Sequence, residues 1–258
     1  MMRSQICVVT FLFLLFFEVS VFAVGFNGHR IIKPTAINCT QPVSLISADG
    51  SFDGWTKIDG KPVNNGWEIV DGVLHRKSNA GDIMTVKTYK NFVMDFEWSI
   101  AKGGNSGIKY KFDKYSKGGW LGCEYQFLDD ANNGEGKRPK HESGALYDII
   151  PPSNKNVVKP YGEVNKSRVI VNGRHIVHYL NGVKVVDICV GSADWKKRLA
   201  DSKFNETLDF GAIESGHIMV QDHGSEVWIQ KLTIRETASV VKCAPRPRPI
   251  LNLLRGGK

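Results

Sequence analysis

The sequence has few long apolar runs, few cysteines and no acidic residues near its C-terminus. Only one apolar run, residues 6–17, approaches the length of a membrane span, and it is too short to cross comfortably. With only five cysteines, the fold must be stabilised mainly by a hydrophobic core. A chain of 258 residues can bury such a core without metals or disulfides. The ordinary composition, 42% hydrophobic and 23% charged, excludes collagen, coiled coil and disorder of the whole chain.

The net charge of +8 is unevenly distributed along the chain. No acidic residue follows Glu236, whereas five basic residues lie within the last 17 positions, 242–258. Together with the prolines and the final Gly-Gly pair, this charge predicts a disordered basic tail over 242–258. The high isoelectric point therefore describes a tail, and we expect no nucleic-acid partner.

The first 23 residues are typical of a secretory signal peptide. Arg3 supplies a positive start, the apolar run follows, and Val21 and Ala23 place small residues before a cleavage site. We expect an exported protein, periplasmic or extracellular, with no stable membrane insertion after cleavage. An uncleaved N-terminal anchor is the alternative.

Four cysteines remain once the signal, with Cys7, is removed. Cys39 and Cys243 flank the region of regular patterning, and because the termini of a domain often lie close together, a Cys39–Cys243 disulfide is the preferred pair of three connectivities. Cys123 and Cys189 lie in strand-like runs and are expected to be buried thiols. The cysteine spacings do not resemble a zinc site.

Alternation of apolar and polar side chains dominates the interior of the chain. Residues 92–100, 107–112 and 121–128 each present one apolar and one polar face, as half-buried strands do. In 107–112 the polar face carries Lys109 and Lys111.

Turn and cap signals complete the prediction of fold class. Asn181-Gly182 lies between two strand-like runs and predicts a hairpin, and Ser192 can cap a short helix over 192–203. Many short antiparallel strands with one short helix predict an all-β sandwich, which we assign to residues 24–241 as a single domain.

Glu124 and Gln126 are the most suggestive local feature. Residues two apart on a strand point to the same face, so a carboxylate and an amide project together from one sheet. Cleavage of a sugar needs a carboxyl group near the scissile bond and amides that hold hydroxyls. Taken alone, the pair is better explained by an ordinary solvated strand face, because antiparallel sheets routinely expose one polar face.

A second carboxylate is missing from this strand. Ordinary glycoside hydrolysis uses two, about 5–5.5 Å apart for retention or about 6.5–9.5 Å apart for inversion. The alternation after Glu124 continues with Gln126 and Leu128. Double displacement is therefore disfavoured, unless Asp148, Glu97 or Asp222 supplies the carboxylate from elsewhere.

Other chemistries find no support in the motifs. The loop 103–107 lacks the following Lys-Ser/Thr of a phosphate-binding loop and leads into a strand, so we interpret it as a turn that places Asn105 at a sheet rim. His175 and His178 are an odd number apart on a strand and cannot share a metal, and no nucleophile elbow is present. Among the tryptophans, Trp120 is the preferred candidate for a pocket rim.

A set of segments, taken in order, resembles a known family. The segments are Phe52-Asp-Gly-Trp55, Trp67-Glu-Ile-Val-Asp-Gly-Val-Leu74, Asp82-Ile-Met-Thr85, Phe96-Glu-Trp98, Gly103-Gly-Asn-Ser-Gly-Ile108, Glu124-Tyr-Gln-Phe-Leu-Asp129, Gly144-Ala-Leu-Tyr-Asp148, Pro152-Ser-Asn-Lys-Asn-Val-Val-Lys-Pro160, His178-Tyr-Leu-Asn-Gly-Val-Lys184 and Gly216-His-Ile-Met-Val-Gln-Asp-His-Gly224. The set is similar to the 3-keto-disaccharide hydrolase domain family over residues 44–236. The resemblance implies a concanavalin A-like jelly-roll β-sandwich.

The resemblance also implies an activity, the hydrolysis of glycosides already oxidised to a ketone at C3. A C3 ketone acidifies the C2 proton, so a base can remove that proton, the leaving group departs from C1 and water adds back. This route needs a base, a proton donor and a group that stabilises the enolate, and it does not need two carboxylates. It is therefore compatible with the missing second carboxylate.

Residue roles follow as expectations. Glu124 is the expected acid/base, with Lys159 and Asp148 as further catalytic candidates. The expected substrate-binding residues are Asn105, Lys111, Gln126, Trp120, Asp222 and His223. The family pattern has Arg at position 111, and Lys gives a point charge in place of a planar fork. No metal ligands and no required cofactor are expected; a structural Ca²⁺ is compatible with such sandwiches, although no acidic loop has a recognisable ligand spacing.

Two other functions stay open at this stage. A lectin-like carbohydrate-binding module would use the same polar face without catalysis. A surface interaction protein would use the basic tail.

Overall fold

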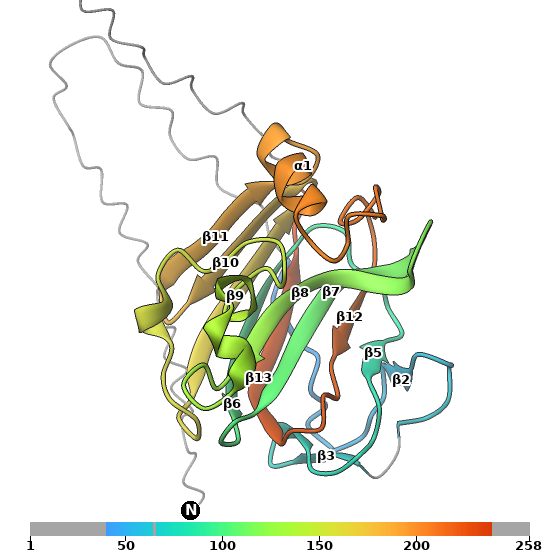
Figure 1. Cartoon of the computed structure of the whole chain (residues 1–258). Helices are drawn as coiled ribbons and strands as arrows, with labels where there is room; N and C mark the ends of the chain where they lie inside the picture. The colour runs from blue at the N-terminus through green and yellow to red at the C-terminus, as the bar shows by residue number, and fades with distance from the viewer. Residues whose placement is uncertain (1–39, 64–65, 239–258) are drawn as a thin grey trace, which may run out of the picture. The chain divides into compact units, whose positions relative to one another are not determined.

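The computed structural model describes residues 40–63 and 66–238, and within them two antiparallel sheets form the fold (Figure 1). The larger sheet has the order β11-β10-β9-β6-β13-β4-β3, with β1 paired to β13. Its strands are β1 (Val43–Ser44), β3 (Trp67–Val70), β4 (Val73–Arg76), β6 (Phe92–Ile100), β9 (Asn165–Asn172), β10 (His175–Leu180), β11 (Val183–Cys189) and β13 (Val227–Glu236).

The smaller sheet has the order β2-β5-β12-β7-β8. Its strands are β2 (Trp55–Lys57), β5 (Ile83–Thr85), β7 (Asn105–Tyr115), β8 (Gly119–Leu128) and β12 (His217–Val220). The described part of the chain also contains one α-helix, α1 (Ala193–Ala200), and three 3₁₀ turns, η1 (Gly134–Lys137), η2 (Pro139–His141) and η3 (Lys155–Val157). Two sheets with one short helix confirm the predicted all-β sandwich.

The core lies between the two sheets and is rich in aromatic rings. Trp98 of β6 stacks on Phe127 of β8 with ring centroids 4.4 Å apart, and Phe96 meets Tyr125 edge to face at 5.0 Å. All four side chains are essentially inaccessible to solvent. The alternation in 92–100 and 121–128 therefore predicted correctly which side chains face the core. Glu124 and Gln126, at the alternate positions of β8, face outward.

Helix α1 begins where the sequence predicts, because the Ser192 hydroxyl accepts a hydrogen bond from the Trp195 amide at 3.1 Å. It ends at Ala200, three residues before the predicted limit. The buried Trp195 and Leu199 hold one face of the helix. The chain that follows α1 then passes close to β8 and contributes to the site described below.

A bulge in β7 overturns the expected position of Lys111. The register between β7 and β8 shifts between Tyr110 and Asp113, and Lys111 has a φ of 51°. The Lys111 side chain is only 2% exposed, and its ammonium donates to the Ile213 carbonyl at 2.6 Å. Phe112 takes the outward position instead, packed with Met84. Lys111 therefore does not share a face with Lys109, as strict alternation predicted.

Cysteine placement agrees with expectation in part. Cys123 is a buried free thiol, as expected. Cys189 is not a free thiol, so the expectation of a second buried thiol was wrong. Cys39 and Cys243 lie outside the described residues, and their pairing stays a prediction. The signal peptide and the basic tail also lie outside the described residues.

Candidate active site

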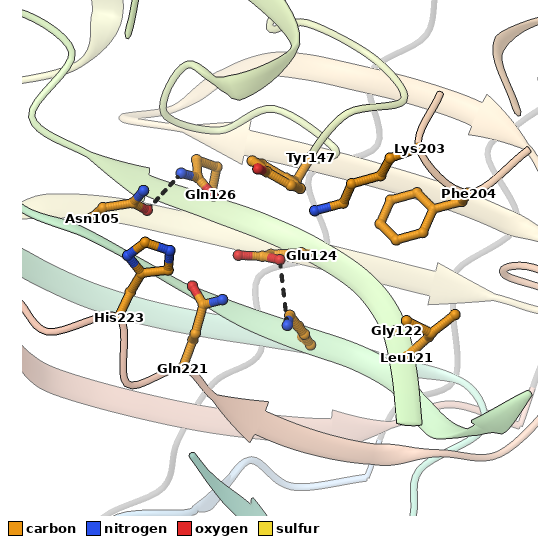
Figure 2. Close-up of a pocket in the computed structure, with 11 residues that line it drawn as sticks. Asn105, Leu121, Gly122, Glu124, Gln126, Tyr147, Lys203, Phe204, Gln221 and His223 are labelled. Carbon is orange, nitrogen blue, oxygen red and sulfur yellow. Dashed lines mark hydrogen bonds and ion pairs between the residues drawn. The ribbon is translucent and has the colours of Figure 1, made fainter. Parts of the chain in front are cut away.

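A cavity of about 180 Å³ lies on the outer face of the smaller sheet (Figure 2). Strands β7 and β8 form its floor, and three connecting segments complete it: residues near 147, the chain after α1, and the chain after β12. Its lining residues are Asn105, Lys109, Leu121, Gly122, Glu124, Gln126, Tyr147, Lys203, Phe204, Gln221 and His223. Sites for drug-sized ligands measure about 300–1,000 Å³, so this cavity is smaller than such sites.

Glu124 lies at the middle of the cavity (Figure 2). Strand alternation directs it outward from β8, and its side chain is 7% exposed. Burial raises the pKa of the Glu124 carboxyl, and the ammonium of Lys109, 3.7 Å from Oε2, opposes that rise. Gly107 on β7 makes room for the carboxylate, because a Cβ there would lie 2.5 Å from Glu124 Oε1.

One end of the cavity is polar. The Gln126 amide donates to Asn105 Oδ1 at 3.0 Å, and His223 lies beside this pair (Figure 2). Gln126 Oε1 is buried and has no hydrogen-bond partner among the described residues. The expected residues Asn105, Gln126 and His223 therefore lie in one cavity with Glu124, where their side chains offer hydrogen-bonding groups to a ligand.

Sequence reasoning did not propose Lys203 and Tyr147 as site residues. The Lys203 ammonium lies 4.2 Å from the centre of the Tyr147 ring. Burial lowers the pKa of Lys203, with Glu124 acting against that shift, and burial raises the pKa of Tyr147 to about 12. Both residues come from connecting segments, where no alternation indicates direction. Lys109 had a signal in the sequence, because alternation placed it on the polar face of 107–112. In the structure it pairs with Glu124 across the β7–β8 register.

Asp148, expected to be catalytic, does not line the cavity. Its Oδ1 lies 3.1 Å from His141 Nε2, and its Oδ2 accepts a hydrogen bond from the Lys203 backbone amide at 2.6 Å. Both carboxylate oxygens are thus occupied by the chain itself. Asp148 holds the Lys203 backbone from outside the cavity lining, and the catalytic role expected for it stays a prediction.

Asp222, expected to bind substrate, is also held by the protein. Its carboxylate lies 2.7 Å from Arg76 Nε and accepts hydrogen bonds from the backbone amides of Ala80 and Gly81 at 2.8 and 2.7 Å. These contacts fix the chain after β12, which places the neighbouring His223 in the cavity.

Lys159 and Trp120 lie outside the cavity. Lys159 is exposed, and its backbone amide donates to Asn165 Oδ1 at 2.9 Å beside β9 of the larger sheet. Trp120 shares the outward face of β8, but its ring stacks on Phe112 with centroids 5.4 Å apart. With Lys111 buried elsewhere, Lys109 and Lys203 are the lysines that line the cavity.

Glu124 is the one carboxylate among the described residues that line the cavity. Neither Asp148 nor Asp222 reaches it, and Glu97 lies on the larger sheet with its carboxylate 3.6 Å from the Lys166 ammonium. The paired carboxylates of ordinary glycosidases are therefore not found in this cavity.

The described residues contain neither a cluster of metal ligands nor a membrane-spanning helix. No group of three or more His, Cys, Asp or Glu side chains is arranged to hold a metal ion there. No helix in that part of the chain is long and apolar enough to cross a membrane.

Comparison with known proteins connects this geometry to carbohydrate chemistry. A 3-keto-disaccharide hydrolase of Bacteroides thetaiotaomicron is 30% identical over 218 residues, which cover 72% of this chain and 75% of the relative. A crystal structure of a candidate glycosyl hydrolase from Parabacteroides distasonis is 33% identical, with a TM-score of 0.68 over 76% of this chain and 93% of the other. A second such structure from that organism is 25% identical, with a TM-score of 0.62 over 76% of this chain and all of the other.

The sandwich, the cavity and these relatives define a carbohydrate hydrolase that acts on glycosidic bonds. A family model, that of the 3-keto-alpha-glucoside-1,2-lyase-like domain, matches residues 42–235. The chain belongs to this family, as the resemblance of its ordered segments predicted.

Proposed function

We propose that the chain cleaves glycosides whose sugar carries a ketone at C3, by elimination followed by hydration. The observation that carries the proposal is a single buried carboxylate, Glu124, between two lysines in a small cavity. A mechanism with one base and cationic groups needs this set, whereas double displacement needs a second carboxylate. The names of the family and of the Bacteroides relative support the 3-keto substrate.

The proposed chemistry proceeds in two stages. In the first, the Glu124 carboxylate takes the proton from C2, and the C2–H electrons form the enolate of the C3 ketone. As the ketone re-forms, the C1–C2 double bond forms, the C1–O bond breaks with its electron pair leaving on oxygen, and that oxygen takes the proton from Glu124. In the second, water adds to C1 of the enone, and C2 regains a proton. The sum is hydrolysis.

The side chains around Glu124 supply the remaining requirements. The Lys203 ammonium offers a positive charge for the enolate oxygen that develops at C3. Lys109, 3.7 Å from Glu124, favours the ionised form of the base. The route requires no cofactor, so we expect activity to survive treatment with EDTA within about twofold of the untreated enzyme.

The first test compares two substrates. The purified mature protein is assayed for sugar release from a 3-keto glucoside and from the unoxidised glucoside. Cleavage of the keto substrate alone, with deuterium incorporated at C2 in D₂O, is the expected result. Cleavage of both substrates without exchange at C2 would mean a conventional glycosidase. Sugar binding without cleavage of either would favour the lectin-like alternative.

A further inference from the structure

The cavity is chemically two-sided, with Glu124 between its ends (Figure 2). At one end lie the amides of Asn105 and Gln126. At the other end lie Leu121, Gly122 and the ring of Phe204, an apolar wall with the Lys203 ammonium 5.1 Å from the centre of that ring. The two ends offer different surfaces to a bound ring.

The chemistry at C2 orients a substrate between these ends, if the function is as proposed above. C2 lies between C3, which carries the ketone, and C1, which carries the leaving group. A base at the centre of the cavity therefore places these two carbons toward opposite ends. The ketone and the neighbouring hydroxyls need hydrogen-bonding groups, which the polar end provides. The leaving group then extends over the apolar end.

We propose that Leu121, Gly122 and Phe204 form a leaving-group subsite that selects glycosides whose leaving group is a ring with an apolar face, and that Phe204 is its specificity-determining residue. Two sources carry such a face, an aryl group and a second sugar ring. This inference rests on the proposed function, because it uses the position of C2 at Glu124.

The packing of Phe204 suits this task. Its ring stacks on Phe210 with centroids 4.1 Å apart and planes 9° from parallel, and Phe210 is 1% exposed, within the core cluster. Phe204 itself stays half-buried and lines the cavity. The ring is therefore held from behind, and a ligand can stack on it at little conformational cost.

Position 122 needs glycine because β7 packs closely against it. Gly122 lies between Trp120 and Glu124 on the outward face of β8. A Cβ there would lie 3.1 Å from the Phe112 Cα atom and from its ring. Phe112 therefore lies against Gly122 beneath this end of the cavity.

The test compares the Phe204→Ala variant with the parent enzyme on three 3-keto glucosides, which carry methyl, aryl and glucosyl leaving groups. The intrinsic ease of departure of each group is the same for both enzymes, so the ratio of their kcat/KM values reports only the contact. We expect Phe204→Ala to lower kcat/KM by about tenfold for a ring leaving group and by less than about twofold for methyl. A loss confined to the aryl or to the glucosyl substrate identifies which ring the subsite takes.

Leu208→Ala is the matched control, because Leu208 belongs to the same segment, is 85% exposed and does not line the cavity. Phe204→Tyr keeps the ring and should keep the preference. This variant guards against misfolding caused by loss of the contact with Phe210.

Failure of the inference differs from failure of the function. An equal change for all three leaving groups, with cleavage intact in the parent enzyme, overturns the subsite and leaves the function standing. Absence of cleavage and of C2 exchange in the parent enzyme overturns both.

Discussion

At the scale of single residues, Glu124 illustrates how burial and function compete. Because burial raises its pKa, the native state holds a proton more tightly than the unfolded chain does. The stability that depends on this group is therefore fully present below the unfolded pKa and is lost as pH rises through the folded pKa.

Glu124→Gln should remove both the catalytic base and the free-energy cost of a buried negative charge. We expect kcat/KM to fall by about 10²–10⁴. Melting temperature at neutral pH should be equal to or above that of the parent, and the difference should disappear in acid. Glu97→Gln, at a carboxylate that also faces a lysine but on the larger sheet, is the control and should leave activity unchanged. Near-normal activity of Glu124→Gln would remove the residue from its assigned role.

Opposite pKa shifts of Glu124 and Lys203 predict a bell-shaped dependence of kcat/KM on pH. The acid limb should lie above the usual range of a glutamate, because Glu124 must be ionised to act as a base. The alkaline limb should lie below the usual range of a lysine, because Lys203 loses its proton at lower pH than an exposed lysine does.

Lys203→Met should abolish the alkaline limb and reduce the rate, as a pH profile of kcat/KM would show. Lys117→Met, at an exposed lysine paired with Glu206, should preserve the profile. An unchanged alkaline limb in Lys203→Met would assign that limb to another group.

Asp148 is expected to act through Lys203. Asp148→Asn leaves only one acceptor oxygen for His141 and the Lys203 amide, so we expect the alkaline limb to shift and kcat to fall by about tenfold. Asp187→Asn is a close control, because Asp187 also bridges a histidine and a lysine, His175 and Lys184, on β11 of the other sheet. A lower stability without any change in the pH profile would mean that Asp148 has only a structural role.

At the scale of elements, the sequence predicted the strands better than it predicted the site. Alternation on β8 was enough to send Glu124 and Gln126 to the same face as each other and away from Tyr125. It failed for Lys111, because a bulge is a tertiary adjustment that a period of two does not contain. It was silent on Lys203, Tyr147 and Phe204, which reach the cavity from segments whose direction is set by long-range contacts.

The bulge in β7 packs against Gly216, the residue directly before β12. A Cβ at Gly216 would lie 2.6–2.7 Å from the backbone of Lys111 and Phe112. Gly216→Ala should therefore force β7 and β12 apart and lower the free energy of unfolding by about 1–3 kcal/mol, measurable by urea denaturation. Gly134→Ala, where a Cβ meets nothing within 4 Å, should be nearly neutral. Equal stability of the two variants would show that the strands accommodate the extra atom.

At the scale of the whole molecule, the outer faces of the two sheets differ. The cavity lies on the smaller sheet, whereas the outer face of the larger sheet carries ion pairs such as those of Asp95 with Arg168 and Arg235. The sandwich itself was predictable, because its core alternates regularly in sequence. The signal peptide and the basic tail stay predictions, because they lie outside the described residues.

Export belongs to this scale too and remains a proposal. Intact-mass measurement of the secreted protein should give a chain that starts at Val24, after cleavage behind Ala23. Peptide mapping without reductant should find a free thiol at Cys123 and no free thiol at Cys189. A secreted chain that retains residues 1–23 would favour the uncleaved anchor.

The extra residue at Lys111 exchanges the outward and inward positions of β7 for the residues that follow it. Before it, odd-numbered positions such as Lys109 face outward; after it, Phe112 does. Insertions and deletions at this point, more than substitutions, therefore decide which residues join the cavity-bearing face. Related chains aligned without a gap there would have their outward and inward residues exchanged along the rest of the strand.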